Sequence, residues 1–186
     1  APGVCWVAPA DHASEATRLN ALLARVATPY CLIIPSAGQW PRRPRLEALI
    51  RPLRQDRCDL VSGTTIACRR GWNLLVKKVR RRQEHAALAI SGTAACLNPV
   101  AATKVDGLVP CDVGSSYLAA RTSELRRIGG WDDSPLSDAT LQLYVRANRF
   151  GLRTAWCPDA AVHVWKGIAA EDSVSEYAVD QLGFTE

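Results

Sequence analysis

Apolar residues in this chain gather either in short unbroken runs or at helical spacing. Runs at residues 4–8, 30–34 and 58–67 are typical of strands. Residues 30–34 show no polar alternation, so we expect that strand to be buried on both faces. A stretch with helical spacing follows each of the first two runs, which predicts the order strand, helix, strand, helix, strand.

The first expected helix lies in "DHASEATRLNALLARVA", with Asp11 or Ser14 as its N-terminal cap. Its apolar positions recur every three or four residues and are Ala16, Leu19, Leu22, Leu23 and Val26. The second expected helix begins at Pro44, which suits a first helical position, and bends near Pro52. Its apolar side consists of Leu46, Leu49, Ile50 and Leu53.

The pattern is clearest in the second half of the chain. "SSYLAARTSELRRIGGWDD" predicts a strand, a short helix capped by Thr122, and a glycine turn. "LSDATLQLYVRANRFG" predicts a helix that begins at Ser137 or Asp138 and ends at Gly151. Its inward residues are Leu141, Tyr144 and Val145. Two further strand-like runs flank Pro158.

This alternation predicts one α/β domain over residues 1–186, in which crossover helices flank a mixed but mostly parallel sheet. Residues 69–110 are less regular, and residues 167–186 are expected to form a polar surface tail.

The formal net charge of +5 and the pI near 9.0 favour anionic partners. The densest basic cluster, "KKVRRR" at residues 77–82, lacks the interleaved aromatic residues of a nucleic-acid-binding surface. We therefore expect a solvated face there and no nucleic-acid partner. No apolar run approaches the roughly 20 residues of a membrane span, so we expect none in this chain.

Seven cysteines are many for a cytosolic protein of this size, and none has the spacing of a zinc site. The cysteine count favours an oxidising compartment, and the spacing argues against zinc.

Several features of the second half follow one another in an order that is informative as a whole. They are Arg121 at a strand end, then Gly129, Gly130, Trp131, Asp132, Asp133, Asp138 at a helix start, Gly151 at its end, and His163 in the last strand. Over roughly residues 110–166 this order resembles the second half of inverting glycosyltransferases with the GT-A fold. "TPYCLIIPSA" is similar to the β-1,4-N-acetylgalactosaminyltransferase type, and "IPSAGQWPRRPRLEALIRPL" resembles the stem domain of fukutin-related protein.

The resemblance implies a GT-A-like, Rossmann-like fold that lacks its first strand and helix. It also implies transfer of a sugar from a nucleotide-sugar donor to a glycan or glycoprotein acceptor. Asp138 would be the catalytic base, since inversion needs a carboxylate that takes the proton of the attacking hydroxyl. The alternative is that Asp138 only caps its helix, and Ser137 stands where the family has glutamate.

By the same resemblance, the substrate site includes Gly129, Gly130, Trp131, Asp132, Asp133 and His163. The residues alone leave other roles open for three parts of this set. The glycines are equally typical of a plain turn, Trp131 of the core, and His163 of a buried strand.

Residues 30–43, "YCLIIPSAGQWPRR", depart from the family, which holds Mn²⁺ or Mg²⁺ with paired aspartates after this strand. The segment contains no acidic residue, so the usual metal site cannot form there. We expect no cofactor, and Mn²⁺ would need ligands from outside residues 30–43. Arg42 and Arg43 are then expected to meet the charge of the diphosphate, the alternative being a solvated helix start.

The alternative function is a catalytically inactive domain that serves as a stem, an oligomerisation surface or a glycan-binding module. A homo-oligomer is open in either case. The resemblance to the stem domain implies a disulfide between Cys68 and Cys111. Both groups of relatives work in the Golgi, so we expect a location in the Golgi or secretory-pathway lumen.

Overall fold

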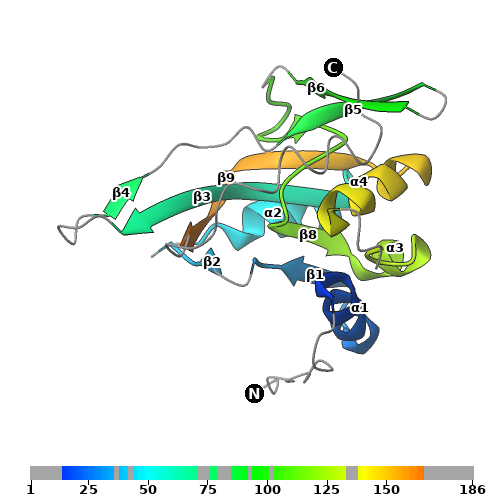
Figure 1. The fold of residues 1–186 in the computed structure, drawn as a ribbon, viewed down its shortest axis with the longest axis horizontal. Helices are drawn as coiled ribbons and strands as arrows, with labels where there is room; N and C mark the ends of the chain where they lie inside the picture. The colour runs from blue at the N-terminus through cyan, green and yellow to red at the C-terminus, as the bar shows by residue number, and fades with distance from the viewer. Residues whose placement is uncertain are drawn as a thin grey trace.

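The computed structural model describes residues 14–35, 38–41, 44–70, 76–78, 85–91, 94–100, 103–132 and 138–165. Within this part, a central sheet carries helix α2 (Leu46–Arg54) on one face. Helices α1 (Glu15–Arg25), α3 (Thr122–Arg127) and α4 (Ala139–Arg149) pack into the core of the other face (Figure 1). A hairpin of β5 (Ala86–Ser91) and β6 (Ala94–Pro99) packs against α4.

The central sheet is built around two long strands, β3 (Leu60–Arg70) and β9 (Thr154–Trp165). Its order is β1 (Tyr30–Ile33), β8 (Leu118–Arg121), β3, β9 and β2 (Gly38–Gln39). The short strand β4 (Val76–Lys78) pairs with β3, and β7 (Val109–Pro110) pairs with β9.

The prediction of a mostly parallel, Rossmann-like sheet is wrong. Strand β8 runs antiparallel to both β1 and β3, and β3 with β9 is the one parallel pair among the described strands. Strands β1 and β3 are joined through α2 and point the same way, as a helical crossover requires. They are not neighbours, however, because β8 lies between them. The GT-A-like fold that the resemblance implied is therefore wrong as well, because the sheet is mostly antiparallel.

Strand β1 forms where residues 30–34 predict it, but its position in the sheet differs from the prediction. It is an edge strand, and all four of its residues are half-buried. Its residues alternate between the two core clusters, so the predicted cover on both faces is present but partial: Cys31 and Ile33 pack toward α1, whereas Tyr30 and Leu32 pack toward α2.

A side-chain cap marks the start of α1, whereas α2 and α3 begin without one. Ser14 caps α1 and accepts a hydrogen bond from the Thr17 backbone, while Asp11 lies outside the described residues. Helix α2 begins at Leu46, two residues after Pro44, and keeps Pro52 inside. Thr122 is the first residue of α3 rather than its cap, and its hydroxyl donates to the Thr28 carbonyl.

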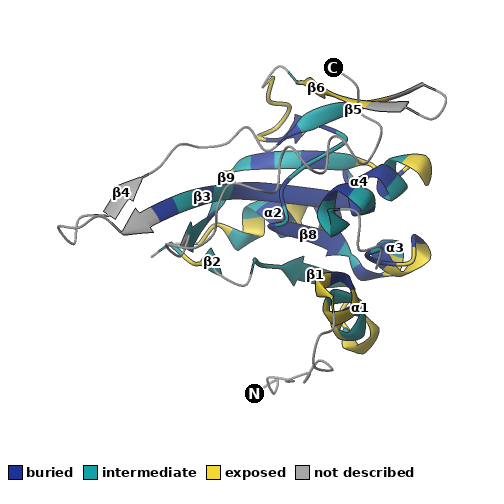
Figure 2. Cartoon of the chain, in the orientation of Figure 1, coloured by how far each residue is buried: buried dark blue, intermediate teal, exposed yellow. Residues whose placement is uncertain are grey.

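The core has two layers because neighbouring residues of a strand point to opposite faces. Leu60 joins the cluster formed with α1, α3 and α4, whereas Val61 joins the cluster formed with α2. Figure 2 shows β3 and β8 as largely buried, while the outer side of α1 is exposed. The two runs around Pro158 form the single strand β9, with a register shift opposite residues 62–64.

The irregular region at 69–110 contains β4, β7 and the hairpin. The expected strand at 4–8 and the expected tail at 167–186 lie outside the described residues. That residues 1–186 form one domain therefore stays a prediction. No helix in the described part is long and apolar enough to cross a membrane.

Candidate functional site

Asp138 caps α4 and stands at the wall of an open cleft. Its Oδ1 accepts hydrogen bonds from the backbone N–H groups of Thr140 (2.8 Å) and Leu141 (3.2 Å). Among the described residues, no group donates a hydrogen bond to Oδ2. The prediction that Asp138 caps this helix is therefore confirmed, and the cap uses only one of the two carboxylate oxygens. Ser137, the alternative start of this helix, lies outside the described residues.

The cleft beside Asp138 has a volume of about 380 Å³. Most of its lining is small or polar, and the residues are Thr65, His85, Ala86, Leu97, Val113, Gly114, Ser115, Ser116, Asp138 and Thr140. The lining includes hydroxyl-bearing residues and one carboxylate residue, and it contains neither lysine nor arginine. This composition suits a neutral ligand that carries hydroxyl groups.

The loop that forms one wall of the cleft is fixed to the sheet. Ser115 Oγ lies 2.8 Å from the Gly63 carbonyl, and the Tyr144 hydroxyl donates to the Ser115 carbonyl (3.0 Å). A Cβ atom on Gly114 would lie 2.2 Å from Ser62 Oγ, so only glycine permits this close approach. Ser115 is thus a structural residue, and the half-buried Ser116 is the better placed of the two to meet a ligand.

The hairpin forms the opposite wall, and Asp112 attaches it to the body of the protein. Asp112 Oδ2 accepts from the Leu88 backbone (2.8 Å), and Oδ1 accepts from the Asn148 side chain (3.2 Å). An antiparallel β-bridge between Val113 and Ala86 also attaches the hairpin. The acid after Cys111 therefore has a structural role.

The Gly129–Gly130–Trp131 turn is held by α1 and does not line the cleft of Asp138. Asn20 donates to the Trp131 carbonyl (2.8 Å) and accepts from the Trp131 backbone N–H (2.9 Å). Gly130 has a φ of 67°, and a Cβ there would lie 2.2 Å from Asn20 Oδ1. Trp131 is 4% exposed and belongs to the core. The plain-turn and core alternatives describe these residues better than sugar contact.

Asn20→Ala is expected to lower the free energy of unfolding by about 2 kcal/mol, because it removes both hydrogen bonds to the Trp131 backbone. Chemical denaturation followed by tryptophan fluorescence measures this change. An Asn20→Ala variant that keeps wild-type stability but loses sugar binding would contradict the structural role of the turn.

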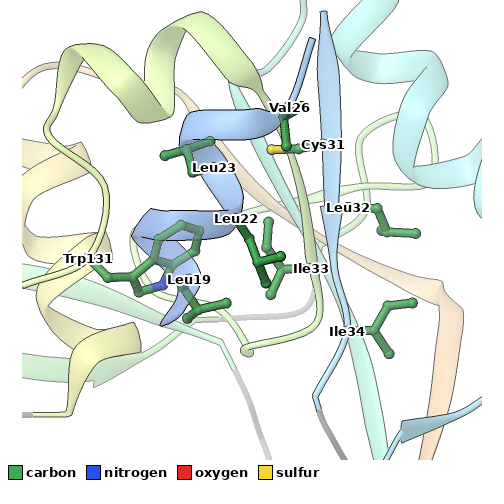
Figure 3. Close-up of a pocket in the computed structure, with 9 residues that line it drawn as sticks. All are labelled: Leu19, Leu22, Leu23, Val26, Cys31, Leu32, Ile33, Ile34 and Trp131. Carbon is green, nitrogen blue, oxygen red and sulfur yellow. The ribbon is translucent and has the colours of Figure 1, made fainter. Parts of the chain in front are cut away.

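A second hollow of about 250 Å³ lies between α1 and β1 (Figure 3). Its walls are apolar and consist of Leu19, Leu22, Leu23, Val26, Cys31, Leu32, Ile33, Ile34 and Trp131. Because these side chains offer no charged group or hydroxyl, the groove does not suit a sugar or a diphosphate. The Asp138 cleft is therefore the better candidate for polar chemistry.

The remaining predicted site residues do not gather around Asp138. His163 pairs with Ile66 of β3 and Gln39 of β2, and it is not part of the cleft lining. Asp132 is half-buried and follows the Trp131 turn. Arg42, Arg43 and Asp133 lie outside the described residues, so their predicted roles stay predictions.

The predicted disulfide between Cys68 and Cys111 is not formed, and both are buried free thiols. Cys68 pairs with Trp165, whereas the Cys111 N–H donates to the carbonyl of Thr154, which itself pairs with Leu60. The stretch of β3 from Leu60 to Cys68 spans roughly 26 Å at about 3.3 Å per residue. That is far beyond the ~7 Å limit between the Cα atoms of a disulfide.

Burial raises the pKa of the Cys111 thiol to about 12, with contributions from Asp112 and Cys58. The thiol is therefore protonated at neutral pH and is a poor nucleophile.

For metal binding, the described residues offer no group of three or more histidine, cysteine, aspartate or glutamate side chains around a common point.

Sequence reasoning missed His85, which lines the cleft and stacks on Trp156 with 4.0 Å between ring centroids. His85 lies just before "AALAIS", in the irregular region, where no motif marks it. Its one signal in the sequence is a polar residue directly before an apolar strand-like run.

A comparison with models of known protein families finds no match, and neither does a search of the curated proteins.

Proposed function

We propose that the chain is a sugar-transfer domain, in which the Asp138 cleft holds the acceptor saccharide. The observation that carries this proposal is a carboxylate fixed at a helix start, whose Oδ1 caps the helix while the residue itself lines a cleft rich in hydroxyl-bearing side chains. Such a carboxylate meets the geometric requirement for a general base, because its position is set before the substrate arrives.

The reaction is a displacement at the anomeric carbon of a nucleotide-sugar donor. The acceptor oxygen forms a bond to that carbon, the bond from carbon to the phosphate oxygen breaks, and the nucleoside diphosphate leaves with the electron pair. The acceptor proton passes to Asp138 Oδ2 as the new bond forms. Because the helix N-terminus keeps Oδ1 engaged, the carboxylate presents one defined oxygen to the hydroxyl.

Donor binding belongs to the proposal through Arg42 and Arg43, whose guanidinium groups would meet the diphosphate. The resemblance at residues 110–166 supports a donor of the nucleotide-sugar class and a glycan or glycoprotein acceptor. A location in the secretory-pathway lumen is part of the same proposal.

The second candidate is a domain that binds saccharides without transferring them. The absence of acidic residues from residues 30–43 favours it, since the resembling enzymes hold their metal there. Both candidates predict saccharide binding in the cleft, and they differ in whether a nucleotide sugar is bound and consumed.

Titration calorimetry with UDP, UDP-galactose, UDP-N-acetylgalactosamine and UDP-N-acetylglucosamine tests the proposal, with and without Mn²⁺. We expect binding without Mn²⁺, followed by release of UDP when a methyl glycoside acceptor is added. Absence of donor binding under both conditions would overturn the proposal that the chain transfers a sugar. Strict dependence on Mn²⁺ would overturn the role assigned to Arg42 and Arg43.

A further inference from the structure

We propose that His85 is a ligand-binding residue of the Asp138 cleft, where its imidazole hydrogen bonds to a hydroxyl group of the saccharide. The inference rests on the proposed function for the identity of that saccharide as the acceptor. It adds a residue from a different part of the chain and a defined contact to the site.

The first support is the state of the His85 ring. The residue is 7% exposed, and neither Nδ1 nor Nε2 has a hydrogen-bond partner among the described residues. An unsatisfied buried polar group costs about 1–3 kcal/mol, and most buried groups in folded proteins have a partner. A ligand that supplies the missing hydrogen bond would gain affinity from this cost.

The second support is that the ring is held in place by stacking. His85 lies flat on Trp156, with an interplanar angle of 10°. Trp156 is fixed in turn, because its Nε1–H donates to Thr64 Oγ1 (3.2 Å). A stacked imidazole keeps both nitrogens in the plane parallel to the indole, so a partner must approach from the side of the ring.

The third support is the chemistry of the cleft, which selects among ligand classes. Asp138 and the absence of lysine and arginine from the lining disfavour an anion. A single carboxylate is a poor site for a metal cation. Burial lowers the pKa of His85, and an interaction with the Val100 backbone opposes this shift only in part, so the neutral imidazole is favoured.

A neutral imidazole has one donor and one acceptor, as a hydroxyl group has. The apolar part of the lining, Ala86, Leu97 and Val113, suits the C–H face of a sugar ring. A saccharide therefore matches the polar and the apolar parts of the cleft together.

Access to the ring involves the hairpin. Both nitrogens are shielded from solvent, so a hydroxyl reaches them when the start of β5 shifts. Strand β5 begins at Ala86 and is attached there through Val113 and through the bond from Leu88 to Asp112. Ligand binding is therefore expected to change the hydrogen-exchange rate of the Leu88 amide.

His85→Phe is the informative variant, because phenylalanine keeps a flat ring on Trp156 and removes both nitrogens. We expect the dissociation constant for the preferred methyl glycoside to rise about tenfold. Stability to urea should be unchanged or higher, since an unsatisfied polar group has been removed. Phe150→Leu is the control, as it changes an exposed aromatic ring outside the cleft lining and should leave binding unaltered.

The direct measurement is the ¹⁵N NMR signal of the imidazole, assigned by its loss in His85→Phe. Methyl galactoside, methyl glucoside and methyl N-acetylglucosaminide are titrated into the wild-type chain. We expect one of them to shift the His85 ring nitrogens and to saturate. No shift up to about 100 mM ligand, or a His85→Phe affinity within about twofold of wild type, overturns the inference.

A transfer assay on the same preparations separates this inference from the proposed function. If the saccharide binds through His85 but no UDP-sugar supports transfer, the role of His85 is retained and the proposed sugar-transfer activity is refuted. Transfer with an unchanged acceptor KM in His85→Phe refutes the inference and retains the enzyme.

Discussion

For the proposed sugar transfer, Asp138→Asn is expected to lower kcat by about 10²–10⁴-fold, the usual contribution of a positioned general base. Asparagine is as good a helix cap as aspartate, so its side-chain oxygen should still accept from the backbone of Thr140 and Leu141. The free energy of unfolding should therefore change by less than about 1 kcal/mol, mainly through the lost interaction with the helix dipole. Initial rates at saturating donor and acceptor, combined with urea unfolding, measure both effects.

Two further variants separate catalysis from capping. Asp138→Ala should lose the carboxylate and the cap together, so it should match Asp138→Asn in rate and be about 1 kcal/mol less stable. Ser14→Ala removes the cap of α1, which is not part of the cleft, and should lower stability by about 1 kcal/mol with kcat unchanged. A wild-type kcat in Asp138→Asn would leave Asp138 as a cap alone and would refute its role as base.

Local features of the fold were predictable where a short stretch of sequence decides the structure. The Ser14 and Asp138 caps, the inward side of α4 and the stop at Gly151 all depend on residues a few positions apart. The pairing of strands depends on the whole chain. Nothing in the local pattern of residues 118–121 shows that this strand inserts between β1 and β3 and reverses the local direction of the sheet.

The candidate site was half predictable for the same reason. Asp138 is marked by its position at a helix start, whereas His85 and Ser116 reach the cleft only through tertiary contacts. Trp131 is the opposite case, since the glycine turn that resembles a substrate loop is tied to α1 by Asn20, and the core alternative left open for Trp131 agrees with its burial. Motif order alone could not separate a turn that faces the core from one that faces a ligand.

Asp59→Asn is expected to lower the free energy of unfolding by about 1–2 kcal/mol, because it removes the charge of a largely buried carboxylate from its pairs with the half-exposed Arg153 and with Arg121. The Asp59 side chain is 13% exposed and lies 3.1 Å from Arg153 Nη2 and 3.7 Å from Arg121 Nε. Its Oδ2 also accepts from the Arg153 backbone N–H (2.9 Å). These contacts join the starts of β3 and β9 to the end of β8, so their loss acts on three strands at once.

Asp56→Asn is the matched control for this prediction. Asp56 contacts Arg121 (2.7 Å) and Arg153 (2.8 Å), but its side chain is 73% exposed. Its φ of 56° is a conformation that asparagine tolerates, so the substitution adds no backbone strain. An exposed pair is worth less than about 1 kcal/mol, and Asp56→Asn should destabilise by no more than that. Equal losses in the two variants would show that burial of Asp59 does not decide the strength of this network.

The pH dependence gives an independent measurement of the same network. Burial acts to raise the pKa of Asp59, but the hydrogen bonds and charge of Arg153, with the charge of Arg121, outweigh it and lower the pKa below that of an ordinary aspartate. Because the folded-state pKa is the lower one, the stabilisation is fully present above the unfolded value and is lost as the pH falls through the folded value. Urea unfolding at a series of pH values should thus show an acid loss of stability that is smaller in Asp59→Asn than in wild type. An equally steep acid loss in the two proteins would mean that other carboxylates, and not Asp59, link folding to protonation.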